Sequence, residues 1–188
     1  DKFERRMKKV GLYSVLFRNS YQKGTWKNFG FERIDEQINI IFTILLYIME
    51  QSLKEEICTM DDISAYMDEV NMKYFHKSLT YADCRELSDF IVNVILCNEG
   101  KVMYFNGYNF KEKEYENLHV SFLQNRVVYL ENGQKRTNYW LTNDGYSMFL
   151  ATLELDNNMK LTIHEMIFKL HLEKATYDKA MEEVKNLF

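Results

Sequence analysis

The sequence contains no proline and only seven glycines in 188 residues. Proline and glycine interrupt helices and shape most tight turns, so their scarcity leaves long stretches free to be helical. Hydrophobic residues make up 46% of the chain and charged residues 28%, which is the balance of a folded globular protein. We therefore expect a packed, mainly α-helical protein with few strands.

Residues 32–57 carry the clearest helical pattern. Apolar side chains recur there at intervals of three and four residues, and a nearly continuous apolar run covers residues 40–49. This run has half the length that a bilayer crossing requires, so it predicts a buried helix. Ile40, Ile44 and Tyr47 add a second apolar face, which must be covered by the N-terminal segment or by a second copy of the chain. We expect these three residues to form a homodimer contact.

Two further helices follow. Thr59 with Asp62, and Thr80 with Asp83, have the spacing of capping boxes in which Asp replaces Glu. They predict the starts of a second and a third helix, the latter closed at residues 98–100. Two helices joined by a short connection make a helix-turn-helix candidate.

From residue 102 onward, the spacing of apolar residues changes to that of short β-strands. Four strands are predicted, at residues 102–105, 120–123, 126–130 and 136–141. Residues 111–114 form a charged loop after the first strand. Between the last two, Asn132-Gly133 predicts a hairpin turn of type I′, in which both residues have positive φ.

Three helices followed by a hairpin is the element order of a winged helix. The predicted fold class is therefore mainly α with a small β-hairpin: a winged-helix domain at residues 31–155, preceded by a basic-aromatic arm at 1–30. A capping box at residues 162–165 and a cap at Thr176 predict an antiparallel helix pair at 156–188, which we expect to continue in the full-length protein. The apolar seam of this pair is expected to bind a partner helix through Met166, Leu170, Tyr177, Met181 and Val184.

Charge is distributed unevenly along the chain. Residues 1–28 carry a net charge of about +6 and the remainder about −10. An acidic body repels a polyanion, so broad nucleic-acid binding across the fold is disfavoured. The arm mixes its cations with aromatic residues, and such a segment can lie on nucleic acid. Docking of the arm on its own domain or on a partner is the favoured interpretation.

No pattern points to catalysis. Cys58, Cys84 and Cys97 lack CxxC spacing, which favours buried structural thiols in a reducing, cytoplasmic compartment. The four histidines lie too far apart to share a metal, and no phosphate loop, GxSxG or HExxH motif occurs. We expect a protein that is not an enzyme, with no cofactor, metal, small-molecule substrate or membrane segment.

Sequence-specific DNA binding by a transcriptional regulator is the alternative function. The third helix of a DNA-reading winged helix enters the major groove and needs Arg, Lys, Asn or Gln on its exposed face. Residues 80–86, at the start of the third helix, contain one basic and two acidic side chains, which are poorly suited to contact DNA. The hairpin is better suited to contact DNA, and its candidate DNA contacts are Arg126, Lys135 and Arg136. The simpler interpretation is that these three are solvated surface charges.

Residues 139–145, Tyr-Trp-Leu-Thr-Asn-Asp-Gly, with Phe-Leu at 149–150, resemble the Y-x-L-T-x-x-G passage from wing to helix in PadR- and MarR-like winged-helix repressors. The continuation through 152–155 to 173–180 resembles the N-terminal part of the MukF-like kleisin subunit (JetA) of Wadjet systems, condensin-type complexes that restrict plasmids. The likeness spans residues 31–188. It implies a winged-helix domain that dimerises or docks, followed by helices that grip the coiled-coil neck of an SMC ATPase in a complex that extrudes DNA. The chain would then be a scaffold whose own contact with DNA is indirect or weak.

Overall fold

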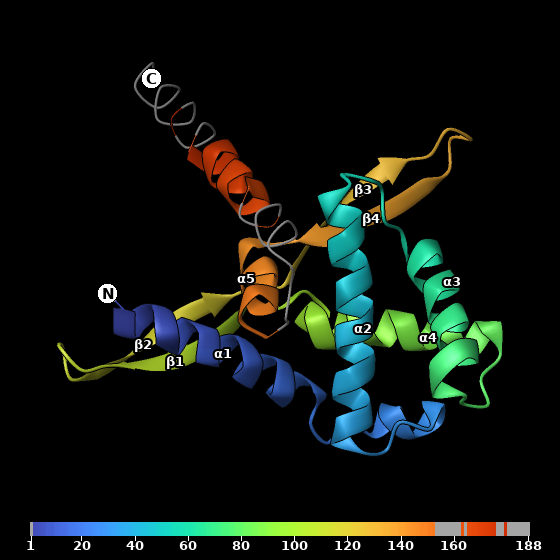
Figure 1. Cartoon of the computed structure of the whole chain (residues 1–188), viewed down its shortest axis with the longest axis horizontal. Coiled ribbons are helices and arrows are strands. Elements are labelled where there is room, and N and C mark those ends of the chain that lie inside the picture. Colours follow the sequence, from blue (N-terminus) through green and yellow to red (C-terminus); the bar gives the residue numbers. More distant parts are fainter. Residues whose placement is uncertain (1, 153–162, 164, 176–178, 180–188) are drawn as a thin grey trace.

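The computed structural model describes residues 2–152, 163, 165–175 and 179 (Figure 1), and the structural statements below concern these residues. The labelled elements are α1 (Lys2–Ser20), α2 (Ile34–Leu53), α3 (Met60–Val70), α4 (Tyr81–Asp89), β1 (Met103–Asn109), β2 (Glu114–Val120), β3 (Leu123–Tyr129), β4 (Lys135–Leu141) and α5 (Asn143–Thr152). A further helix covers residues 165–175. The chain is mainly helical, as predicted. It forms two separate antiparallel hairpins, β1–β2 and β3–β4, whereas the predicted fold class contained one.

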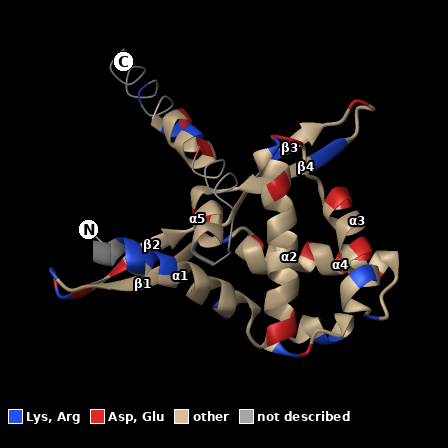
Figure 2. Ribbon diagram, in the orientation of Figure 1, with Lys and Arg blue, Asp and Glu red and all other residues tan. Residues whose placement is uncertain are grey.

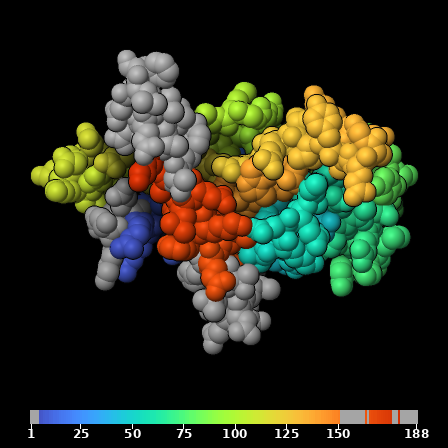
Figure 3. Space-filling model, turned by 90° about the horizontal axis from the view of Figure 1, so that it is seen from above, coloured from blue at the N-terminus to red at the C-terminus, as the bar shows by residue number. Residues whose placement is uncertain are grey.

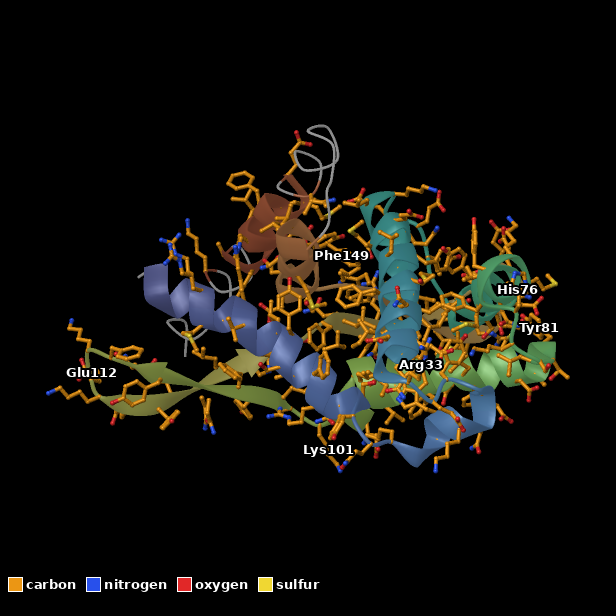
Figure 4. All side chains as sticks on the ribbon, turned by 60° about the horizontal axis from the view of Figure 1, so that its bottom comes forward. Arg33, His76, Tyr81, Lys101, Glu112 and Phe149 are labelled. Carbon is orange, nitrogen blue, oxygen red and sulfur yellow. The ribbon has the colours of Figure 1, made fainter. Side chains whose placement is uncertain are left out.

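The central element is α2, which lies between α5 on one side and α3 on the other (Figure 1). Ile40 and Ile44 are each 0% exposed. Phe149 of α5 packs edge-on against α2 through Phe42, with 6.1 Å between ring centroids (Figure 4). Tyr47 is half-buried and stacks on another ring of the same chain. The predicted homodimer contact is therefore wrong for Ile40 and Ile44, because neither side chain reaches the surface.

The N-terminal segment covers part of α2 and belongs to the same core. Most of the predicted basic-aromatic arm is a long helix, α1, whose aliphatic side chains are partly buried in the core. The short 3-10 helix Gly24–Phe29 adds Trp26, which is 1% exposed and meets Phe90 edge-on at 5.0 Å. Residues 2–30 therefore dock on their own domain.

The second and third helices begin where the capping boxes predicted. At α3 the Asp62 amide donates to Thr59 Oγ1 (3.3 Å), and the Thr59 amide donates to the Asp62 carboxylate (2.9 Å). Thr80 and Asp83 form the same reciprocal pair at α4. The third helix then continues as a π-helical stretch, Phe90–Leu96, which is almost entirely buried.

The first hairpin is longer than its sequence suggested. The register runs from Met103 opposite Val120 to Asn109 opposite Glu114, and the charged loop lies between the strands as predicted. The strand expected at 120–123 is wrong: β2 ends at Val120 and β3 begins at Leu123. Side chains on one face of this hairpin pack against α1, where the pattern of buried and exposed residues alternates along each strand.

The second hairpin pairs Leu123 with Leu141 at its base and Tyr129 with Lys135 near its tip. Its turn differs from the prediction. Gly133 has a φ of 80°, but Asn132 does not adopt positive φ, so the turn is not type I′. The loop closes instead through the Gly133 amide, which donates to the Leu130 carbonyl (2.8 Å). This loop is longer than a two-residue turn, and it needs only one residue in the left-handed conformation.

Thr142 caps the passage from β4 into α5. The Gly145 amide donates to Thr142 Oγ1 at 3.1 Å. A Cβ on Gly145 would lie 2.4 Å from Leu141 Cδ2 and 2.7 Å from the Phe122 carbonyl oxygen, so only glycine lets α5 start this close to the hairpin base. The second member of the predicted C-terminal helix pair lies outside the described residues. No helix in the described ranges has both the length and the apolar character needed to cross a membrane.

Candidate interaction surfaces

The segment between α2 and α3 joins the base of the second hairpin. The Tyr139 amide donates to the Cys58 carbonyl (2.9 Å), and the Cys58 amide donates to Asn138 Oδ1 (2.7 Å). At the end of α2, Ser52 Oγ accepts a hydrogen bond from the Leu141 amide (3.1 Å). These bonds fix β4 against α2 and set the hairpin beside α3 and α4.

A groove of about 640 Å³ results between α3, α4 and the β3–β4 hairpin. Its lining mixes charges of both signs with a few apolar side chains: Met60, Asp61, Arg85, Glu86, Asp89, Val127, Lys135, Arg136, Thr137 and Tyr139. Figure 2 shows the cations of β4 facing the acidic start of α3. In position the groove corresponds to the surface that the sequence suggested for DNA.

Asp61 pairs with both arginines of the groove. Its carboxylate pairs with Arg85 Nη1 at 3.1 Å and with Arg136 Nε at 3.0 Å. Glu86 and Asp89, from the exposed side of α4, add two further carboxylates. The groove therefore carries three acids and three cations, a balance without the excess of positive charge that phosphate binding uses.

The three predicted DNA contacts do not gather on one surface. Arg136 is held by Asp61, and Lys135 lies in the groove beside it. Arg126 lies on the face of the hairpin opposite to that of Lys135, and its guanidinium lies 5.9 Å from the ring centroid of Trp140. Arg126 lines a different hollow, together with residues of helix 165–175.

Helix 165–175 lies on the surface beside the end of α2 (Figure 3). Ile163, just before it, is fully buried, and Met166 and Leu170 are half-buried against the core. Lys169 forms an ion pair with Glu55 after α2. Two of the predicted partner-binding residues, Met166 and Leu170, thus contact their own chain. The other three, Tyr177, Met181 and Val184, lie outside the described residues.

The outer side of the same helix carries apolar side chains that the sequence reasoning did not select. Phe168 is 63% exposed and Leu172 is 52% exposed. They are four residues apart, so they share one helix face. The apolar pattern of residues 163–172 was visible in the sequence, but only the packing of Met166 and Leu170 shows which side remains uncovered.

Burial suppresses the reactivity of the three cysteines. Desolvation raises the pKa of Cys58 to about 12, and it raises the pKa values of Cys84 and Cys97 to about 11. Nearby carboxylates, Asp62 and Asp68, raise the pKa values of Cys58 and Cys84 further. The thiols are thus protonated at neutral pH and are poor nucleophiles. Cys58 and Cys84 are buried as predicted, while Cys97 is half-buried.

Comparison with known proteins adds no relative: the chain matches no family model, no curated protein and no solved structure. Within the described ranges, no group of three or more His, Cys, Asp or Glu residues could hold a metal ion.

Proposed function

We propose that this chain is a non-enzymatic interaction module, a winged-helix domain whose helix 165–175 binds a helix of a partner protein. The observation that carries the proposal is the second apolar face of that helix. Met166 and Leu170 already pack on the core, yet Phe168 and Leu172 point to solvent. An apolar helix face needs a cover, and burying each of these two side chains would stabilise a complex by about 1.5–3 kcal/mol.

The order and pairing of the elements support a winged-helix domain. In this interpretation α2, α3 and α4 are its three helices, and β3–β4 is its wing. At the base of the wing, the backbone at Cys58 adds a hydrogen bond to Tyr139 of β4 without forming a strand. The β1–β2 hairpin is then an insertion between the third helix and the wing.

The proposed partner is the coiled-coil neck of an SMC-type ATPase, with this chain as part of a kleisin-like scaffold subunit. Two features support this choice. The first is the resemblance of residues 31–188 to the MukF-like kleisin subunit. The second is chemical: Phe168 and Leu172 lie four residues apart on one exposed helix face, which suits packing along another helix.

The alternative, a DNA-binding transcriptional regulator, is less well supported. It requires cations free to contact phosphate along the groove, whereas Arg85 and Arg136 are bound to Asp61. Glu86 and Asp89 line the same groove. The proposed interaction module needs no duplex in this groove.

The test is co-purification of this chain with the coiled-coil neck of an SMC-type ATPase encoded beside it, followed by measurement of affinity. The double variant Phe168→Glu/Leu172→Glu is expected to weaken the complex by about 100-fold or more, because two apolar contacts become charged.

The matched control replaces equally exposed apolar residues elsewhere. Met72 is 64% exposed and Val102 is 58% exposed, and neither lies on helix 165–175. Met72→Glu/Val102→Glu should bind like the wild type. An intact complex in the Phe168→Glu/Leu172→Glu variant, or no complex with the wild type, would overturn the proposed function.

A further inference from the structure

The outer face of the β1–β2 hairpin is an exposed ladder of aromatic and amide side chains. Because one face of the hairpin packs on α1, the alternate residues of both strands point away from it. The register sets three rungs opposite one another: Tyr104 with His119, Asn106 with Asn117, and Tyr108 with Tyr115. This hairpin projects from the opposite end of the molecule to the groove, with Glu112 at its tip (Figure 4).

The rings of this ladder are held in place by one another. Tyr108 meets Tyr115 at 5.2 Å and Phe110 at 4.9 Å, both edge to face, and Tyr104 meets His119 at 5.8 Å. Even so, Tyr104 is 47% exposed and Tyr115 is 71% exposed. Tyr104 and Tyr115 therefore leave about half or more of their surface in water.

The amides of the middle rung have open hydrogen-bonding groups. Asn106 and Asn117 are both exposed and lie directly opposite each other. Among the described residues, no hydrogen bond engages either side chain. An Asn side chain offers both donors and an acceptor, so it can pair with the edge of a nucleobase.

The ladder itself carries no negative charge. None of its six members is a carboxylate, and the carboxylates Glu114 and Glu116 alternate onto the strand face turned to α1. Lys111 and Lys113 flank Glu112 in the turn. At the other end Arg18 donates to the Tyr104 carbonyl at 3.0 Å.

We propose that the outer face of the β1–β2 hairpin binds single-stranded nucleic acid, with bases stacked on Tyr104 and Tyr115 and phosphates near Lys111, Lys113 and Arg18. Such binding requires two elements: exposed aromatic rings on which bases stack, and cations that contact the phosphates. A duplex buries its base faces, so it cannot use the rings. The proposal does not depend on the proposed function, because helix 165–175 and the groove contribute nothing to this surface.

The test is fluorescence anisotropy of a short labelled oligo(dT) at low salt. Tyr115→Ala is expected to weaken binding by about ten-fold, the loss of one stacked base. Tyr129→Ala is the matched control, because Tyr129 is 72% exposed on the other hairpin and should not matter. Lys111→Gln/Lys113→Gln should flatten the dependence of affinity on salt.

Several outcomes would overturn the proposal. The first is that oligo(dT) does not bind. The second is that Tyr115→Ala and Tyr129→Ala lose the same affinity for oligo(dT). The third is that duplex DNA competes with labelled oligo(dT) as well as unlabelled oligo(dT) does. Binding of an oligosaccharide without oligo(dT) would assign the ladder to sugar stacking instead. Self-association lost in Tyr115→Ala, without oligo(dT) binding, would assign it to a second copy of the chain.

Discussion

Asp61 and Arg136 form an ion pair across the groove, with 3.0 Å between the carboxylate oxygen and Nε, although they are 75 positions apart in sequence. The same carboxylate holds Arg85 at 3.1 Å. Asp61, at the start of α3, is therefore paired with one arginine of the third helix and one of the wing.

Neutralising Asp61 should create the DNA affinity that the wild-type groove lacks. Asp61→Asn frees two guanidinium groups, so non-specific duplex binding at low salt is expected to rise by about ten-fold and to become more salt-dependent. Electrophoretic mobility shift or anisotropy titrations measure this. Glu86→Gln removes one charge from the same groove without freeing an arginine, so it should change little. Equal gains in both variants would show that net charge alone is responsible.

Ile44 is expected to act through stability rather than assembly. Its side chain is 0% exposed in α2, so Ile44→Ala should lower the free energy of unfolding by about 2–5 kcal/mol. Ile57, which is 50% exposed, supplies the control: Ile57→Ala should cost far less. Urea unfolding measures both. A normally stable Ile44→Ala variant with a smaller mass in solution would instead restore the dimer hypothesis.

Gly145→Ala should destabilise the junction between the second hairpin and α5. The added Cβ would lie 2.7 Å from the Phe122 carbonyl oxygen, which is backbone and cannot easily move. Overpacking of this kind costs about 1–3 kcal/mol. Gly24→Ala is the control, because a Cβ there meets nothing within 4 Å. Thermal unfolding that shifts equally in both variants would contradict the close approach.

The Glu36–Lys77 ion pair should make stability depend on acid pH. The hydrogen bond from Lys77 holds the pKa of Glu36 below its ordinary value of 4.5, although partial burial opposes the shift. A carboxyl group with a lowered pKa in the folded state adds stability above pH 4.5, which is lost as the pH falls through the folded value.

Glu36→Gln should therefore lower stability at neutral pH by about 0.2–1 kcal/mol, the range of partly exposed ion pairs, and the difference should vanish in acid. Chemical unfolding at several pH values measures it. Glu32→Gln, at an exposed position without an ion pair in the described part of the chain, should show no such trend. A difference that persists in acid would mean that the change acts through packing.

The helices were predictable because their signals are local. Capping boxes at Thr59 and Thr80 involve residues three apart, and the apolar period of α2 is written in one stretch of chain. The turn at Asn132-Gly133 shows the limit of local reasoning. The dipeptide marked the right place, but the hydrogen bonds of the surrounding loop selected a turn in which only Gly133 has positive φ.

The candidate surfaces were harder to predict, because exposure depends on what else packs nearby. Ile40 and Phe168 are both apolar residues on helices, and the sequence offers no means to tell that the first is enclosed and the second is not. Asp61 could be taken for a helix-start residue, since Arg136 reaches it only after the hairpin has folded against α3.

By itself the sequence determined where α3 and α4 begin, where the turn of the second hairpin lies and how charge divides between the ends of the chain. The tertiary structure alone decided which apolar faces stay in contact with water and which cations pair with a carboxylate. The reason is range: caps and periodicity act over a few residues, whereas burial and ion pairing depend on side chains that only the folded chain brings together.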